Sequence, residues 1–139
     1  MTFLDTNIFL YAISGAPKEE NKRTIARDIL RRDGLALSVQ VLQEFYVQAT
    51  RASRPDPLTH DEASELIGHW LRFHVVPVTV PVLQNALTLK SLHCISYWDA
   101  AIIAAASAAK CDVLFSEDLS PGQDYGGVKV INPFLEFTP

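Results

Sequence analysis

Four acidic side chains of this sequence interrupt apolar segments, where an unpaired charge is costly to bury. They are Asp5, Glu44, Asp99 and Asp118, four of the 16 Asp and Glu residues in a chain of 139. Carboxylates that gather in a partly desolvated pocket repel one another, so either their pKa values rise or a cation neutralises them. If the fold brings these four side chains together, they predict an acidic site with affinity for a metal ion.

The residue types at this site favour a hard divalent cation. The two cysteines and four histidines of the chain show no zinc-ligand spacing, and an all-oxygen ligand set prefers Mg²⁺ or Mn²⁺ to Zn²⁺. Such an ion binds a phosphate oxygen, lowers the pKa of an attacking water and stabilises an in-line displacement. The four acids therefore predict hydrolysis of phosphodiester bonds without an organic cofactor.

Short strand-like runs alternate with longer helical runs along the chain, which is the pattern of an α/β domain. The expected strands are residues 2–4, 35–37, 75–78, 113–115 and 128–131. The expected helices are residues 8–12, 20–33, 41–49, 60–73, 81–92 and 96–110. Pro77 favours an edge position for the third strand. We predict one domain over residues 1–139, a three-layer α/β/α sandwich with a mostly parallel five-stranded sheet.

These elements place the four acids near one edge of the sheet. Asp5 and Asp118 follow the first and fourth expected strands, and the carboxyl ends of parallel strands are where α/β proteins bind ligands. Asp99 lies in the first turn of a helix capped by Ser96, where the helix dipole favours an anion. Glu44 lies about two turns into the helix that follows the second strand. All four side chains are expected to converge.

The overall charge argues against a protein that holds nucleic acid through a broadly basic surface. The chain has 12 Lys and Arg against 16 Asp and Glu, for a net charge of −4. Without the four site acids the numbers of acids and bases are equal. Contacts to a nucleic-acid backbone must therefore be local, and half of the bases fall within residues 18–32. The candidate RNA-contacting residues are Arg23, Arg27, Arg51 and Arg54.

Several features indicate a cytoplasmic protein. Cys94 and Cys111 form no CxxC pair and are expected to be small buried residues in a reducing compartment. The N-terminus has no basic region typical of a signal peptide. The small-apolar stretch 100–109 is far shorter than the ~20 residues that span a membrane.

The tryptophan beside the acid at position 99 has two possible roles. An exposed Trp98 would offer a platform on which a nucleobase stacks. A tryptophan beside a buried helix start is more often part of the core, so we expect core packing for Trp98, as for Trp70.

Four segments of the chain resemble the acidic motifs of PIN-domain nucleases. They are Asp5–Asn7 after the first strand, the helix that carries Glu44, Ser96–Ala101, and Ser116–Leu119 after a late strand. The length of the chain and its closing segment Val130–Phe134 resemble the VapC-type ribonuclease toxins of prokaryotic toxin–antitoxin pairs. The resemblance covers the whole chain and implies a PIN-like fold.

The resemblance also implies an activity, partners and residue roles. The implied activity is endonucleolytic cleavage of RNA, often a tRNA or rRNA, that depends on Mg²⁺ or Mn²⁺. The implied assembly is a homodimer inhibited by a cognate antitoxin protein. The implied catalytic residues are Asp5, Glu44, Asp99 and Asp118, with Asp5, Asp99 and Asp118 as metal ligands. Asn7 and Ser116 would support them, and the adjacent Glu117 is an alternative last ligand.

Two other functions fit parts of the pattern. A catalytically idle PIN-like module would bind partners through its apolar surfaces, and its acids need not bind metal. A receiver-like phosphoacceptor also uses Mg²⁺ and carboxylates at strand ends. That class expects adjacent N-terminal acids and a late lysine, which the segment Asp5–Asn7 and the helix of Asp99 fit poorly.

Overall fold

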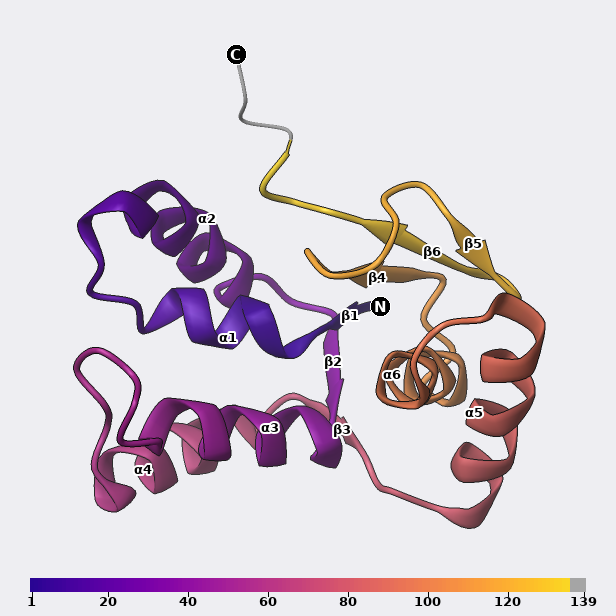
Figure 1. The fold of residues 1–139 in the computed structure, drawn as a ribbon, viewed down its shortest axis with the longest axis horizontal. Helices are drawn as coiled ribbons and strands as arrows, with labels where there is room; N and C mark the ends of the chain where they lie inside the picture. The colour runs from indigo at the N-terminus through magenta and orange to yellow at the C-terminus, as the bar shows by residue number, and fades with distance from the viewer. Residues whose placement is uncertain (136–139) are drawn as a thin grey trace.

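The first strand of the chain, β1 (Thr2–Leu4), lies inside a six-stranded sheet of order β3-β2-β1-β4-β6-β5. The structure is a computed structural model and describes residues 1–135 (Figure 1). The other strands are β2 (Leu35–Ser38), β3 (His74–Val76), β4 (Val113–Phe115), β5 (Asp124–Tyr125) and β6 (Val128–Ile131). All neighbouring strands are parallel except β5 and β6. The predicted α/β architecture is confirmed.

Helices cover both faces of this sheet, so its central strands are apolar on both sides. Phe3, Leu37 and Leu114, on three adjacent strands, are completely buried. Figure 1 shows α1 to α4 on one side of the sheet, with α5 and α6 on the other. The helices are α1 (Thr6–Ala12), α2 (Glu20–Leu30), α3 (Val39–Thr50), α4 (His60–Trp70), α5 (Val80–His93) and α6 (Tyr97–Ala108), with a short 3₁₀ helix at Pro17–Glu19.

The sheet has one strand more than the predicted five. The additional strand β5 pairs antiparallel with β6 through a turn at Gly126 and Gly127. Both glycines have positive φ, 64° and 98°, a conformation that hairpin turns require and that side chains disfavour. Because β5 is only two residues long, it shows no alternation that a sequence pattern could reveal. β3 is an edge strand, as Pro77 predicted.

Side-chain caps set the start of the helices that approach the predicted site. The Ser38 hydroxyl accepts a hydrogen bond from the Val41 amide at 3.2 Å, and the Ser96 hydroxyl accepts one from the Asp99 amide at 3.1 Å. Both serines were predicted as helix caps, and both are confirmed. The helix expected over residues 20–33 is shorter than predicted, because α2 ends at Leu30 and the chain turns towards β2.

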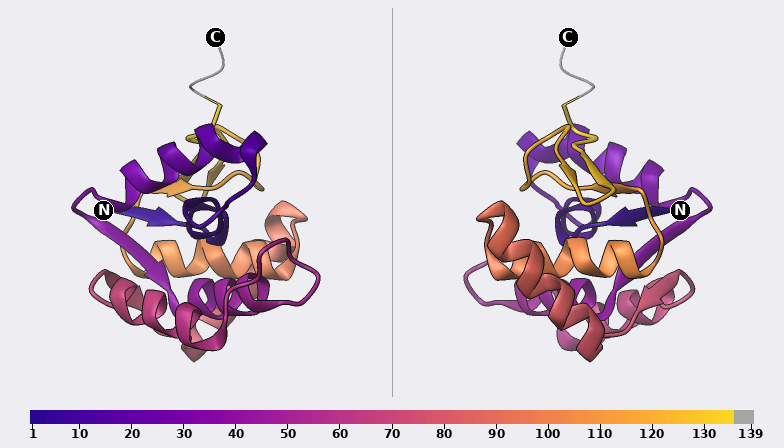
Figure 2. Two further views of the ribbon diagram at one scale, coloured as in Figure 1. Left: turned by 90° about the vertical axis from the view of Figure 1, so that its left-hand side faces the viewer. Right: turned by 90° about the vertical axis from the view of Figure 1, so that its right-hand side faces the viewer.

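The core on the side of α5 and α6 depends on small residues. Residues 100–106 of α6 are all buried, and five of the seven are alanines, so α6 packs closely against α5 (Figure 2, right-hand view). On the opposite side of the sheet, Trp70 packs edge-on against Phe9 and Phe45, with 4.7 Å between ring centroids in each pair. The core position predicted for Trp70 is confirmed, since its side chain is 4% exposed.

Two expectations about burial are wrong. Trp98 is 64% exposed, because it lies in the first turn of α6, before the fully buried part of that helix. Cys94 is exposed as well, because it ends α5 in a left-handed turn with φ of 53°. Cys111 is buried, as expected. Within residues 1–135, no helix has the length and apolar character needed to cross a membrane.

Candidate active site

All four predicted acids line a single pocket of about 310 Å³ at the carboxyl edge of the sheet. Asp5 follows β1, Asp118 follows β4, Glu44 comes from α3 and Asp99 from α6. The parallel pairing of β1 with β4 aligns Leu4 with Phe115, so the chain leaves both strands at the same edge. The capped starts of α3 and α6 bring the other two carboxylates to that edge.

Asp5 is the most buried acid of the site, with only 5% of its surface exposed. Its Oδ1 accepts a hydrogen bond from the Thr6 amide, and its Oδ2 accepts one from the hydroxyl of Ser116, both at 2.7 Å. The Ser116 hydroxyl also accepts a hydrogen bond from the Asp118 amide at 3.2 Å. Ser116 is completely buried, and it therefore joins the two acids that follow β1 and β4.

Burial raises the pKa of Asp5 to about 6. The hydrogen bonds from Ser116 and Thr6 stabilise the charged form and oppose this shift. The negative charges of Asp118 and Glu44 add smaller contributions that raise the pKa further. Near neutral pH the site therefore holds a carboxylate whose charge is poorly solvated, and a bound cation would relieve this cost.

Glu44 and Asp99 are less buried and interact with each other across the pocket. Burial raises the pKa of both carboxyl groups, and the negative charge of Asp99 adds to the shift of Glu44. The Gln40 amide donates to Glu44 Oε1 at 3.0 Å and to the main-chain oxygen of Trp98 at 3.3 Å. Gln40 thus connects α3 to the first turn of α6 and orients Glu44.

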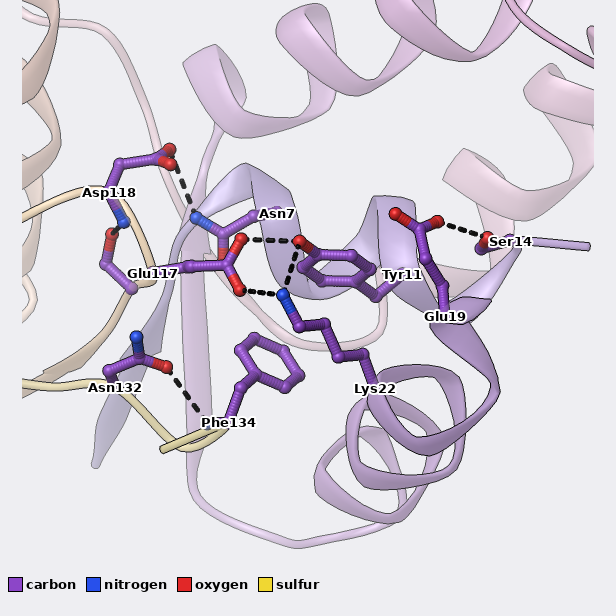
Figure 3. Close-up of polar contacts among 10 residues, drawn as sticks. Asn7, Tyr11, Ser14, Glu19, Lys22, Glu117, Asp118, Asn132 and Phe134 are labelled. Carbon is purple, nitrogen blue, oxygen red and sulfur yellow. Dashed lines mark hydrogen bonds and ion pairs between the residues drawn. The ribbon is translucent and has the colours of Figure 1, made fainter. Parts of the chain in front are cut away.

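The Asn7 amide nitrogen donates to Asp118 Oδ2 at 3.2 Å (Figure 3). The Asn7 Oδ1 atom is buried and has no hydrogen-bond partner among the described residues. The Thr6 hydroxyl, also in the pocket, acts on Glu44 and opposes the rise of its pKa. A buried oxygen without a partner is unusual and fits the edge of a site that binds a cation and its waters.

The donor set fits a hydrated ion better than a tightly ligated one. In the part of the chain that the structure describes, no three His, Cys, Asp or Glu side chains are close enough together to hold one ion. Mg²⁺ keeps several of its waters and binds proteins through one or two carboxylates. A divalent ion in this pocket would therefore be held by one or two carboxylates and by its own waters.

Glu117 also lines the pocket, but its carboxylate points to Tyr11 and Lys22, which both bind it (Figure 3). The Tyr11 hydroxyl donates to Glu117 Oε1 at 2.5 Å, and Lys22 Nζ lies 2.7 Å from Oε2. The ring of Tyr11 packs edge-on against Phe134 at 4.9 Å. This arrangement favours Asp118 over Glu117 as the acid that faces the other carboxylates.

The candidate RNA-contacting arginines lie in three different places. Arg54 lines the carboxylate pocket, and Arg51 lines a shallow hollow beside it. Arg23 and Arg27 instead donate to main-chain oxygens of residues 14 and 12, at 3.0 and 2.8 Å. These two bonds attach α2 to the end of α1 and do not bring the guanidinium groups to the pocket.

Sequence reasoning missed three residues that hold the site together: Gln40, Tyr11 and Lys22. Gln40 precedes Glu44 by one helical turn, so the spacing contained a usable signal. Lys22 meets Glu117 across 95 residues, and no local pattern could have indicated that pair.

We predict that Asp5→Asn removes a specific pH dependence of stability. The folded-state pKa of Asp5 is raised, so its contribution to stability is present at acidic pH and is lost as pH rises through about 6. In EDTA the wild type should gain about 1 kcal/mol more than the variant between pH 7 and pH 5. Urea unfolding at both pH values measures the difference, and equal changes in the two proteins would contradict the assignment.

We predict that Lys22→Met loosens the turn that carries Asp118. Loss of the ammonium group frees Glu117 from one of its two partners, and amide hydrogen exchange of residues 116–118 should become several-fold faster. Lys18→Met is the matched control, because Lys18 is exposed and makes no ion pair within residues 1–135. Unchanged exchange in Lys22→Met would show that the pair does not hold the turn.

Comparison with known proteins agrees with this geometry. The family model of the PIN domain matches residues 2–120, a range that contains all four acids. No curated protein sequence is significantly similar to this chain.

Solved structures share the fold at low sequence identity. A toxin–antitoxin complex from Klebsiella pneumoniae is 18% identical over 96% of this chain and 98% of its own, with a TM-score of 0.69. VapC20 of Mycobacterium tuberculosis, a Sarcin-Ricin loop cleaving toxin, is 19% identical over 85% of this chain and 92% of its own, with a TM-score of 0.66. FitAcB from Neisseria gonorrhoeae is 20% identical over 96% of this chain and 99% of its own, with a TM-score of 0.66. The family match and the shared fold confirm the resemblance seen in the sequence, and the chain belongs to the PIN-domain family.

Proposed function

We propose that this protein is a metal-dependent endoribonuclease and the toxin of a type II toxin–antitoxin pair. The observation that carries the proposal is the convergence of Asp5, Glu44, Asp99 and Asp118 in one pocket from four separate segments of the chain. Four carboxylates at one edge destabilise each other electrostatically. Such a site is better explained by a bound cation than by a role in folding.

The residues of the pocket would have different roles in metal binding and in positioning. A divalent ion, when bound, supplies a Lewis acid for the phosphate and a water of lowered pKa. Asp5, Asp99 and Asp118 would hold it directly or through water, and Glu44 would bind it or orient the attacking water. Ser116 keeps Asp5 and Asp118 together through its two hydrogen bonds. Asn7 would hold the carboxylate of Asp118 in place.

The proposed substrate is a cytoplasmic tRNA or rRNA. Arg54 lines the carboxylate pocket and is the best placed of the four arginines to contact a phosphate. Arg51 would contact the RNA just outside the carboxylate pocket. Arg23 and Arg27 remain candidates only for contacts at a distance from the acids, since both are bonded to the main chain. An RNA loop as the target has a precedent in VapC20, described as a Sarcin-Ricin loop cleaving toxin.

We predict discrete cleavage of end-labelled tRNA or rRNA by the wild type with Mg²⁺ or Mn²⁺ and none in EDTA. Asp5→Asn preserves volume but removes charge from the cation site, and it should lower the rate by several orders of magnitude. Arg54→Gln should weaken binding of substrate with a smaller effect on the cleavage step.

Two controls separate this activity from its alternatives. Asp112→Asn changes an exposed acid outside the pocket and should cleave like the wild type. Induced expression of the wild type should arrest growth, whereas Asp5→Asn should not. Metal-independent cleavage, or full activity of Asp5→Asn, would contradict the proposal. A well-folded wild type that neither cleaves RNA nor binds Mn²⁺ would favour an idle PIN-like interaction module.

The proposed partners are a cognate antitoxin and a second copy of this chain. The antitoxin is supported by structural neighbours described as toxin–antitoxin complexes. The second copy is supported by the outer face of α5, where Val80, Leu83 and Leu87 recur at helical spacing and are 65%, 42% and 55% exposed. An apolar stripe on a helix that is already packed against α6 is typical of a protein interface.

We predict that the wild type sediments as a dimer and that Leu83→Glu shifts it to a monomer, because a charge in the middle of an apolar interface is not solvated. Leu71→Glu is the matched control. Leu71 is 57% exposed at the end of α4 and should leave the dimer intact. A dimer that withstands Leu83→Glu would place the interface elsewhere.

A further inference from the structure

Trp98 lies at the border of the carboxylate pocket with most of its indole uncovered. It immediately precedes Asp99 in the first turn of α6 and is 64% exposed. Its main-chain oxygen is held by Gln40, and its ring meets the ring of Tyr97 at 5.1 Å with an interplanar angle of 76°. Burial in the core therefore does not account for this side chain, although its backbone position is well defined.

The exposed indole forms one wall of a shallow hollow of about 350 Å³. Val47, 61% exposed, lies in the same hollow. The polar residues there come from α3 and its C-cap: Gln40, Gln43, Glu44, Gln48 and Arg51. Trp98, Gln48 and Glu44 line both this hollow and the carboxylate pocket. The two depressions are therefore neighbours that share a wall.

The residues of the hollow match the chemistry of a nucleobase. An indole offers a flat apolar face on which any base can stack. Glutamine amides carry both donors and acceptors, which is what hydrogen bonding to a base edge requires. Arg51 adds a cation beside an otherwise acidic site, where a phosphate of the same strand would lie.

We propose that this hollow binds a nucleobase of single-stranded RNA next to the phosphodiester bond in the carboxylate pocket, with Trp98 as the stacking platform. The proposal rests on the proposed ribonuclease function and names a residue that positions its substrate. Each nucleotide of an RNA strand carries one base and one phosphate. If one phosphate of the RNA lies at the four acids, the base of a neighbouring nucleotide is therefore close to the hollow, which shares a wall with the carboxylate pocket.

A second copy of the chain is the other possible occupant, and the polar groups argue against it. Three of the hollow's residues, Gln43, Gln48 and Arg51, would need partners if a protein face covered them. The α5 stripe of Val80, Leu83 and Leu87 is the more apolar surface for that contact, and it borders Trp98, since Trp98, Val80 and Leu83 line one groove of about 400 Å³.

The tryptophan content of the chain allows a direct test by fluorescence. The chain has two tryptophans, and Trp70 is 4% exposed, so a ligand that quenches the emission on contact reports on Trp98. The protein is Asp5→Asn in Mg²⁺, because its expected loss of cleavage keeps the RNA probes intact while a cation is available to offset the remaining acids. The probes are octa-adenylate and octa-uridylate RNA, compared with an octamer of abasic ribose phosphates that has the same charge and no bases.

We expect both base-containing octamers to quench the emission and the abasic octamer to leave it unchanged. Fluorescence anisotropy of labelled RNA measures the affinity of further variants made in the Asp5→Asn protein. There, Trp98→Ala should weaken octamer binding by about tenfold and Trp98→Phe by less than about threefold. Binding of the abasic octamer should not change in either variant. Leu71→Ala removes a 57% exposed apolar side chain at the C-cap of α4 and should bind like its parent.

Three results would overturn the base site. The first is quenching of equal size by the abasic octamer, and the second is unchanged octamer affinity in Trp98→Ala. The third is a shift of Trp98→Ala from dimer to monomer in sedimentation without loss of RNA affinity, which would assign the hollow to contact between copies. Metal-dependent cleavage of tRNA and rRNA tests the proposed function separately, so it can succeed while the base site fails.

Discussion

The carboxylate of Asp5 is removed from water at the end of the central strand β1, and the neighbouring structure stabilises it there. The Thr6 amide and the Ser116 hydroxyl each donate a hydrogen bond to it, and these bonds partly replace lost solvation. They do not remove the repulsion from Asp118 and Glu44. The rest of the fold must therefore hold the charges together, through the parallel register of β1 with β4 and the capped start of α3.

The positions of the four acids could be predicted from sequence because each follows a local rule. Asp5 and Asp118 follow apolar strands, Asp99 follows a helix cap, and Glu44 interrupts an apolar helix face. Strand ends and helix starts are set by nearby residues, so the convergence of these acids needed only the parallel topology. The same reasoning supplied the α/β layers and the edge position of β3, but it missed the two-residue strand β5.

The features that could not be predicted depend on contacts between distant segments. The partners of Glu117 come from α1 and α2, about a hundred residues away. The density of bases within residues 18–32 made Arg23 and Arg27 candidates for RNA contact, but it could not show that both side chains reach back to the end of α1. Trp98 was misjudged because the apolar run that follows it, from Ala100 onwards, is buried, whereas Trp98 itself precedes the covered part of α6.

The order in which the strands are synthesised differs from their order in the sheet. β1 is synthesised first, yet it lies between β2 and β4. Asp5 gains its hydrogen bond from Ser116 only across 111 residues of chain. A ribosome-bound chain that lacks the last strands therefore contains the first acid of the site without its partners. Since such long-range pairing forms late, the complete carboxylate pocket cannot form until β4 and the strands after it have left the ribosome, and an incomplete translation product would lack the proposed site.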